Sequence, residues 1–366
     1  MRALFAVSGR TQWEDALRVA VHLPGARLVD LDSFAVTDPP PPGTPYGGVH
    51  WPAQGFRRVV ELRRRLDDLL RDVDVLVLGQ DVGRLQRVAV AAARRAGVPV
   101  AVVPDGAFFD IPQQLPLTVR VQEVLLRAAR LVPDAPPQFG ATRPDLVCAW
   151  GEGWVPLFER FTPAGRVVVT GSPRFGDLGA LPPAPAGPPA VLVCSQQTWV
   201  YPFDPSTTSG PAWYGWLDRL ARSAPPGRLR IRLHPRELDT RDTLPLTPAI
   251  DACCTVGTTL ADDMAASHIV VAPLSTVLLE AGVAGRHVVS VVPDEGCLPV
   301  RRACPPMADT RLEMHLAADV PDFTTLVSLA GGTASEWATT YARATPTAPA
   351  TCATAITDLV AAPVAP

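Results

Sequence analysis

The chain has 366 residues, of which 47% are hydrophobic and 19% charged, and its formal net charge is −3. This length is sufficient for two globular domains, each with a sizeable core. The near-neutral charge gives no basic footprint for nucleic acid and no cationic funnel for acidic substrates at the level of the whole chain.

Cysteine usage and hydropathy indicate the cellular compartment. The seven cysteines have no C-x-x-C spacing, and most lie in apolar, strand-like contexts. We therefore expect reduced, buried thiols and no metal site, because no Cys/His cluster has ligand spacing. The N-terminal stretch MRALFAVSGR is too short in its apolar part for a signal peptide, and no apolar run approaches the roughly 20 residues of a spanning helix. These features predict a soluble, cytoplasmic protein.

Apolar strands alternate with helical patterns along the first half of the chain. The predicted strands are residues 2–8, 26–31, 74–79 and 98–106. Helices are predicted from Trp13 onward and over residues 83–97. Near-continuous apolar strands separated by helices are typical of a parallel sheet that is covered on both faces. The first half is therefore predicted to be a Rossmann-like domain.

Two further segments of this half bear on function. Residues 55–72 form an amphipathic helical pattern with arginines on its polar side. This pattern predicts a helix packed on the sheet with a solvated basic face, and weak association with a membrane surface is the alternative. The turn-rich loop at 38–51 carries Tyr46, His50 and Trp51, which are candidates to contact an acceptor molecule. A plain surface loop is the alternative.

The second half repeats the α/β pattern. Its predicted strands are residues 166–171, 190–195, 228–234, 268–273 and 287–292. Near its start, a Pro/Ala/Gly-rich stretch has the composition of a linker. The predicted parts are an acceptor-binding domain (1–178), a Pro-rich linker (179–190), a nucleotide-sugar-binding domain (191–332), and a C-terminal helix with a flexible tail (333–366). The predicted fold class is thus α/β, with two Rossmann-like domains facing a central cleft.

Polar residues directly follow several predicted strands. Ligands of open α/β sheets bind outside the carboxyl ends of the strands, so these residues are candidates for one site. They are Asp105 with Gly106, Gly171 with Ser172, Ser195 with Gln196, His234, and Ser275 with Thr276.

His234 ends a predicted strand, and Pro235 fixes the chain direction immediately after it. An imidazole at this place can donate an N–H group to an anionic oxygen and, when protonated, add a full charge. Arg236 can pair with an anion, and Glu237 can accept a hydrogen bond from a ribose hydroxyl. The alternative is a structural histidine that ends a strand.

Ser275 and Thr276 lie between a predicted strand and a helix that contains Glu280. Two hydroxyls and the free N–H groups of a helix start suit a nucleotide phosphate. The alternative is an ordinary Ser/Thr cap, with Glu280 as a carboxylate on the helix surface.

Asp105 is the candidate general base for an acceptor hydroxyl, with Gly106 leaving room for the acceptor to approach. Asp110 is a second choice, and a turn-capping role for Asp105 is the alternative.

These motifs resemble a known family. LRIRLHPRE (229–237) and DDMAASHIVVAPLSTVLLEAGVAGRHVVSVV (262–292) resemble the C-terminal domain of bacterial sialyltransferases and polysialyltransferases with the two-domain GT-B fold. The Asp-Gly in VPDG (103–106) resembles the Asp-Gly of the same group. Two departures are Thr276, where that group often has a second Ser, and Arg232, where it frequently has Lys.

The resemblance implies an inverting transfer without cofactor or metal. A sialic-acid-like or Kdo-like sugar would pass from CMP to a hydroxyl of a glycan, a lipid-linked saccharide or a natural product. Asp105 would be the general base, His234 would bind the departing phosphate, and Ser275 with Thr276 would hold it. Glu237 would hold the ribose, and residues 171–173 would line the domain crossover.

Three alternatives stay open. The His-Pro and Ser-Thr arrangement also resembles glycerophosphotransferases that use CDP-glycerol, although the Asp-Tyr of their Asp-Tyr-Ser-Ser run is absent here. UDP-N-acetylglucosamine 2-epimerases share the fold, but this chain has no early His-Arg-Glu segment. The third alternative is a nucleotide-binding module without catalysis. The predicted partners are a nucleotide-activated donor and a hydroxyl acceptor, not nucleic acid.

Overall fold

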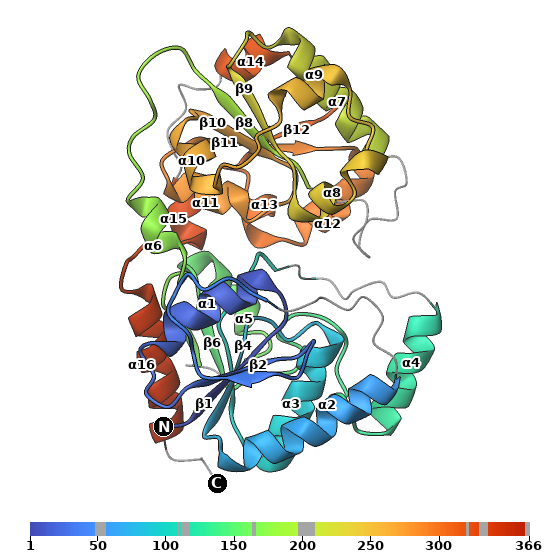
Figure 1. Ribbon diagram of the computed structural model, residues 1–366, viewed down its shortest axis with the longest axis vertical. Helices are drawn as coiled ribbons and strands as arrows, with labels where there is room; N and C mark the ends of the chain where they lie inside the picture. The colour runs from blue at the N-terminus through green and yellow to red at the C-terminus, as the bar shows by residue number, and fades with distance from the viewer. Residues whose placement is uncertain are drawn as a thin grey trace. The chain divides into compact units, whose positions relative to one another are not determined.

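A computed structural model of the chain describes residues 1–47, 56–108, 110, 117–162, 166–196, 209–319, 322–328 and 336–362. The chain divides into two compact units (Figure 1). Unit 1 comprises residues 1–176 and 345–366, and unit 2 comprises residues 177–344.

Unit 1 is built on a seven-stranded sheet with the order β3-β2-β1-β4-β5-β6-β7. All neighbouring strands are parallel except the β2–β3 pair. The strands are β1 (Ala3–Val7), β2 (Arg27–Asp30), β3 (Val36–Thr37), β4 (Val75–Leu78), β5 (Val100–Val102), β6 (Leu146–Ala149) and β7 (Val167–Val169). β1, β4, β5 and β6 are buried along their whole length, as expected for central strands covered on both faces.

The helices of unit 1 cover this sheet. They are α1 (Arg10–Ala20), α2 (Phe56–Leu69), α3 (Arg84–Ala96), α4 (Leu117–Ala128), α5 (Val155–Phe158) and α16 (Ala348–Ala361), with 3₁₀ turns η1 (Leu70–Asp72) and η2 (Glu152–Trp154). The predicted amphipathic helix is α2, which packs on α3 through Val59, Leu62 and Leu66. Phe56, predicted on the apolar side of this helix, is exposed.

The prediction of a flexible C-terminal tail is wrong. α16 packs on α1 and β6, and Cys352, Ile356 and Leu359 join the core of unit 1. These residues recur at i, i+4 and i+7, which is the spacing of one helix face. The Ala/Thr/Pro composition obscured this stripe, because alanines fill most of the remaining positions.

Unit 2 contains a five-stranded, fully parallel sheet with the order β12-β11-β10-β8-β9. Its strands are β8 (Val191–Cys194), β9 (Leu229–Arg232), β10 (Ile269–Ala272), β11 (His287–Val292) and β12 (Glu313–Leu316). Its helices are α7 (Ser209–Ser223), α8 (Pro235–Asp239), α9 (Pro248–Cys253), α10 (Leu260–Ala265), α11 (Val277–Val283), α12 (Leu298–Arg302), α13 (Pro305–Ala308), α14 (Phe323–Ser328) and α15 (Glu336–Tyr341), with 3₁₀ turns η4 (Arg241–Thr243) and η5 (Glu295–Cys297). α6 (Phe175–Gly179) spans the boundary between the two units.

The Pro-rich stretch 180–190 belongs to unit 2 rather than standing between the domains. Arg286 Nη2 donates a hydrogen bond to the carbonyl oxygen of Pro182 at 2.7 Å, and Arg228 donates another to that of Pro188. The predicted first boundary at residue 178 lies two residues from the observed one at 176.

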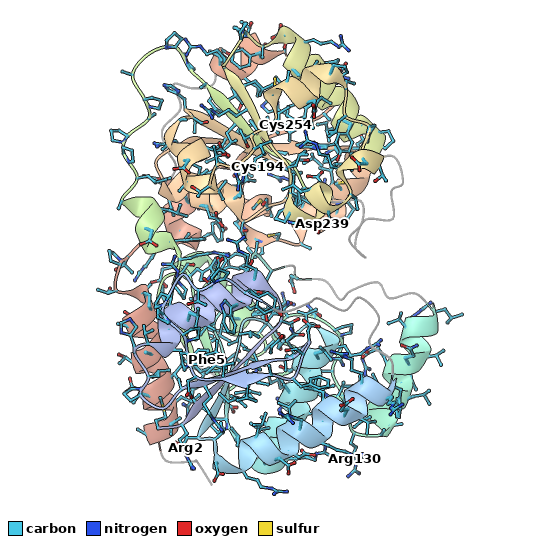
Figure 2. All side chains as sticks on the ribbon, viewed as in Figure 1. Arg2, Phe5, Arg130, Cys194, Asp239 and Cys254 are labelled. Atoms are coloured by element: carbon cyan, nitrogen blue, oxygen red, sulfur yellow. The ribbon has the colours of Figure 1, made fainter. Side chains whose placement is uncertain are left out.

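All seven cysteines are free, and five of them are buried. Figure 2 marks one of these, Cys194, at the end of β8. None of the helices in the described ranges is both long and apolar enough to cross a bilayer.

Candidate functional site

The candidate nucleotide site of unit 2 lies at the carboxyl edge of its sheet. β10, β8 and β9 are neighbours and parallel, so the residues that follow them lie side by side. These residues are Ser275 and Thr276 after β10, Gln196 after β8, and His234 after β9. Figure 1 shows α8, α11 and α12, which follow β9, β10 and β11, at the same end of unit 2. With strands about 4.8 Å apart, β10 and β9 span about 10 Å.

His234 begins the short helix α8. Pro235 occupies the first helical position, where its missing N–H group costs nothing. Glu237, two residues further on, accepts a hydrogen bond from the backbone N–H of His234 at 2.7 Å. This contact is the Glu half of a capping box, and it fixes the backbone from which the half-buried imidazole extends. The side chain of Arg236 lies outside the described residues.

Glu237 is 0% exposed and is the centre of a buried hydrogen-bond network. Its Oε1 accepts bonds from Ser195 Oγ at 2.8 Å and from the Tyr214 hydroxyl at 2.9 Å. Ser195 Oγ in turn accepts a bond from Trp213 Nε1 at 2.9 Å. Burial raises the pKa of Glu237, and the bonds from His234 N–H, Ser195 and Tyr214 oppose that rise.

This network corrects two predicted contacts. Glu237 was expected to hold the ribose and Ser195 to contact the nucleotide, but both side chains are buried and bonded to groups of unit 2. Their role in the structure is to hold the ends of β8 and β9 together. The sequence signal was present, because Glu three residues after a cap position is typical of helix starts.

The Ser275–Thr276 pair forms the turn between β10 and α11, as predicted. Both residues are half-buried, and Ser275 Oγ accepts a bond from the N–H of Val277 at 3.3 Å. Glu280 lies on the buried side of α11 rather than on its surface. Its charge is close enough to Cys194 to help raise the pKa of that buried thiol, after burial itself and against the opposing charge of Arg232.

Arg232 has a structural role. Its Nη1 lies 2.8 Å from Asp263 Oδ2 on α10 and donates to the carbonyl oxygen of Thr258 at 2.9 Å. Asp263 is fully buried, so this pair ties α10 to β9.

Sequence reasoning missed Arg301 on α12. This residue is 7% exposed, and the described residues offer no hydrogen-bond acceptor to its buried Nε. Burial lowers its pKa. A cation held in this way is costly in the absence of an anion, which makes Arg301 a candidate ligand for one. Its sequence, VRRAC, has the composition of an ordinary basic helix end.

Asp105 follows β5 at the carboxyl edge of the unit 1 sheet and is half-buried. Burial raises the pKa of its carboxyl group, while a hydrogen bond from the Gln12 side chain and the charge of Arg174 oppose the rise. Arg174 Nη2 also donates to the backbone oxygen of Asp105 at 2.8 Å. A Cβ atom on Gly79 would lie 2.8 Å from Gln12 Cγ, so glycine at this position allows Gln12 to reach Asp105. A carboxyl group with a raised pKa suits a general base.

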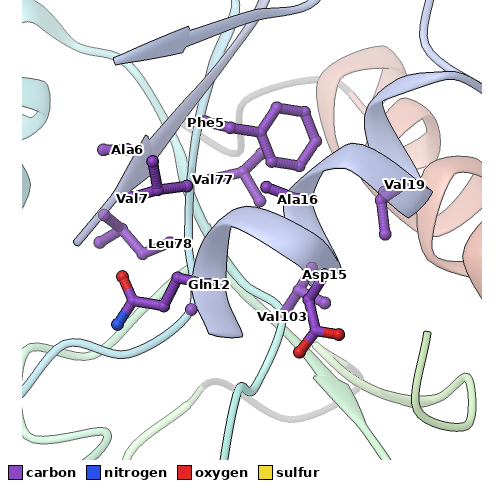
Figure 3. A pocket seen from close by; sticks show the side chains of 11 residues that line it. Phe5, Ala6, Val7, Gln12, Asp15, Ala16, Val19, Val77, Leu78 and Val103 are labelled. Atoms are coloured by element: carbon purple, nitrogen blue, oxygen red, sulfur yellow. The ribbon is translucent and has the colours of Figure 1, made fainter. Parts of the chain in front are cut away.

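The support behind Asp105 is a second feature that the sequence did not reveal. Gln12 and Asp15 project from α1 into the wall of a cavity of about 10 Å³ between α1 and the sheet (Figure 3). Arg174 Nη1 lies 3.9 Å from Asp15 Oδ2. The cavity is large enough for about one water molecule, so it is part of the support and not a ligand pocket.

Space next to Gly106 is open, since a Cβ atom there would meet no atom of the chain within 4 Å. Tyr46 is less available than predicted. Its hydroxyl donates to Asp30 Oδ1 at 3.0 Å, and its ring packs on Trp13 with centroids 5.8 Å apart. The other two predicted acceptor residues, His50 and Trp51, lie outside the described residues.

Gly171 and Ser172 follow β7 and belong to unit 1. Gly171 adopts a left-handed conformation with φ of 81°, which favours glycine. Ser172 is completely buried, so the predicted contact of its hydroxyl with the nucleotide is corrected. Within the described ranges, no group of three or more His, Cys, Asp or Glu side chains is arranged to hold a metal ion.

No protein-family model matches the chain, and no curated protein matches it in sequence. Solved structures do match it in fold. A UDP co-structure of MnaA from S. aureus aligns with a TM-score of 0.53 and 11% identity over 96% of this chain and 94% of that one. UDP-N-acetylglucosamine 2-epimerase from Rickettsia bellii aligns with a TM-score of 0.54 and 12% identity over 99% and 96%.

The wall teichoic acid polymerase TagF, as its H548A variant, aligns with a TM-score of 0.54 and 8% identity over 98% of this chain and 88% of that one. A second structure of TagF contains CDPG. At such identities the likeness concerns the fold alone. The chain therefore has the two-domain, Rossmann-like GT-B fold, which confirms the predicted fold class.

Proposed function

We propose that the protein is a nucleotide-sugar-dependent glycosyltransferase, in which unit 2 binds the donor and unit 1 supplies the base for the acceptor hydroxyl. The observation that carries this proposal is the row of Ser275–Thr276, Gln196 and His234 at adjacent strand ends. Ligands of parallel α/β sheets bind at this edge.

The chemistry of the row fits a departing nucleotide. As the bond to the donor group breaks, negative charge develops on the phosphate. Donors that are already in place stabilise that charge most effectively. Ser275 and Thr276 offer hydroxyls, His234 offers an imidazole on a capped backbone, and Arg301 offers a cation for a second phosphate. Asp105 takes the proton of the acceptor hydroxyl.

The donor is proposed to be a nucleoside diphosphate compound, either a UDP-sugar or CDP-glycerol. Two of the matched structures have names or ligands of this chemistry, the UDP-bound MnaA and TagF with CDPG. The CMP-activated sialic-acid-like or Kdo-like donor implied by the sequence resemblance ranks behind them. A UDP-sugar epimerase is the second candidate function, because MnaA and the Rickettsia bellii enzyme support that branch equally on fold.

The first test is calorimetric titration of CMP, CDP, UDP and GDP, with EDTA and then with Mg²⁺. We expect UDP or CDP to bind more tightly than CMP and GDP. The S275A/T276A variant should lose this affinity. Ser328→Ala is the matched control, since α14 lies at the opposite end of unit 2 (Figure 1). A preference for CMP would restore the nonulosonic-acid donor, and absence of binding to any nucleotide would overturn the proposal.

The second test separates transferase from epimerase. The protein is incubated with the UDP-sugar or CDP-glycerol alone and then with candidate acceptors. Nucleotide release that depends on an acceptor supports the transferase. Conversion of UDP-N-acetylglucosamine to its C2 epimer without an acceptor assigns the epimerase instead.

A further inference from the structure

Helix α4 of unit 1 is anchored by one face only. Glu123 is buried on that face and forms an ion pair with Arg87 of α3, and its Oε1 lies 3.2 Å from Arg84 Nε. Leu126 is buried on the same side. This contact fixes the rotation of α4 about its own axis, so the opposite face is turned to solvent.

The solvent face carries a continuous apolar stripe. Leu117 is 68% exposed, Val121 53%, Val124 64% and Leu125 57%. Their spacing of i, i+4, i+7 and i+8 places them on one side of a helix about 18 Å long. Exposed apolar side chains are normally scattered singly. Here four of the ten large exposed hydrophobic residues of the described chain lie on one 12-residue helix.

The charges around the stripe are basic. Arg120 and Arg130 are exposed, and Arg127 is about one-third exposed, with its Nη1 3.9 Å from Asp134. The one acidic residue of α4, Glu123, is buried and paired on the other face. An apolar stripe flanked by arginines is complementary to a bilayer with anionic headgroups. Figure 1 shows α4 at the periphery of unit 1, with the sheet and α3 on one side only.

We propose that α4 docks on an anionic lipid surface. Leu117, Val121, Val124 and Leu125 enter the boundary between headgroups and acyl chains, and Arg120 and Arg130 pair with lipid phosphates. The docking surface is distinct from both strand-end sites, and it does not depend on which nucleotide the protein uses. It differs from the membrane role considered for residues 55–72, because the apolar side of α2 is packed on α3.

The test is flotation of the full chain with vesicles of phosphatidylcholine alone and with 30% phosphatidylglycerol. We expect binding to the anionic vesicles that weakens as salt rises. The V121Q/V124Q/L125Q variant should bind about ten-fold less or weaker still. The matched control is V21Q/V256Q/M314Q, which removes three exposed apolar side chains elsewhere. R120Q/R130Q should lose the preference for anionic lipid.

Three results would overturn the proposal. The first is equal binding of the stripe variant and its control. The second is no preference for phosphatidylglycerol over phosphatidylcholine in the unmodified chain. The third is a dimer, measured by light scattering without vesicles, that the stripe variant abolishes, because the stripe would then be an interface between two copies.

Discussion

Removal of the Glu237 carboxylate tests whether this residue is the structural centre of the nucleotide edge. Glu237→Ala leaves three buried donors without an acceptor: the N–H of His234 and the hydroxyls of Ser195 and Tyr214. An unsatisfied buried donor costs about 1–3 kcal/mol, and the Ser195 hydroxyl can rotate to another acceptor. We therefore expect a loss of about 3–5 kcal/mol in local stability.

Two milder variants grade the effect. Glu237→Gln keeps one acceptor oxygen, so one side of the network faces an amide N–H₂ group, at about 1–3 kcal/mol. Tyr214→Phe removes one donor and leaves no group unsatisfied at Glu237, at about 0.5–1.5 kcal/mol. Hydrogen exchange of residues 229–239 in the full chain measures local opening directly, which suits a two-domain protein. If Glu237→Ala opened this segment no more than Tyr214→Phe does, the reasoning would be refuted.

The same carboxylate predicts a pH dependence. Because burial raises its pKa, folded Glu237 retains a proton at pH values where the unfolded chain has released it. Its contribution to stability is therefore present below the ordinary carboxyl range and is lost as pH rises through the raised pKa. Glu237→Gln cannot titrate, so its local stability should lack this change.

Three further predictions concern the proposed chemistry. His234→Ala should weaken nucleotide affinity about ten-fold or more and lower turnover, whereas Asp105→Asn should lower turnover about 10²–10⁴-fold with affinity unchanged. Calorimetry and initial rates distinguish these roles, and equal loss of affinity in both variants would contradict the division. Gln12→Ala removes a hydrogen bond that lowers the Asp105 pKa, so the acidic limb of the kcat/KM profile should move to higher pH. An unmoved limb would exclude Asp105 as the titrating base. Arg301→Met should raise unit 2 stability by about 1 kcal/mol or more while weakening binding of diphosphates more than of CMP. A loss of stability would show that Arg301 is structurally required.

The strand-end positions could be predicted from sequence because buried parallel strands are contiguous apolar runs whose ends are marked by polar residues. This placed Asp105, His234 and Ser275 at sheet edges correctly. The direction of each side chain was beyond the same reasoning. Glu237 and Ser195 have the residue types of ligand groups, but a cap interaction and a neighbouring helix turn them inward.

Residues distant in sequence account for most of what was missed. Gln12 acts on Asp105 from 93 positions away, and its effect depends on the lack of a side chain at Gly79. α16 completes unit 1 after the chain has passed through unit 2, and its apolar stripe is short and rich in alanine. Local patterns of hydrophobicity carry no information on these pairings, because they arise only when the sheet has formed.

The two proposed catalytic groups have independent supports. Asp105 is held by Gln12 and Arg174, which belong to unit 1, and the backbone of His234 is held by Glu237, which belongs to unit 2. Each network lies wholly within one unit, so the pKa of the base and the position of the phosphate ligand are each set before any substrate binds. A reaction divided in this way needs the substrates, rather than a shared hydrogen-bond network, to connect the two chemistries. Donor affinity and the ionisation of Asp105 should therefore vary independently among variants.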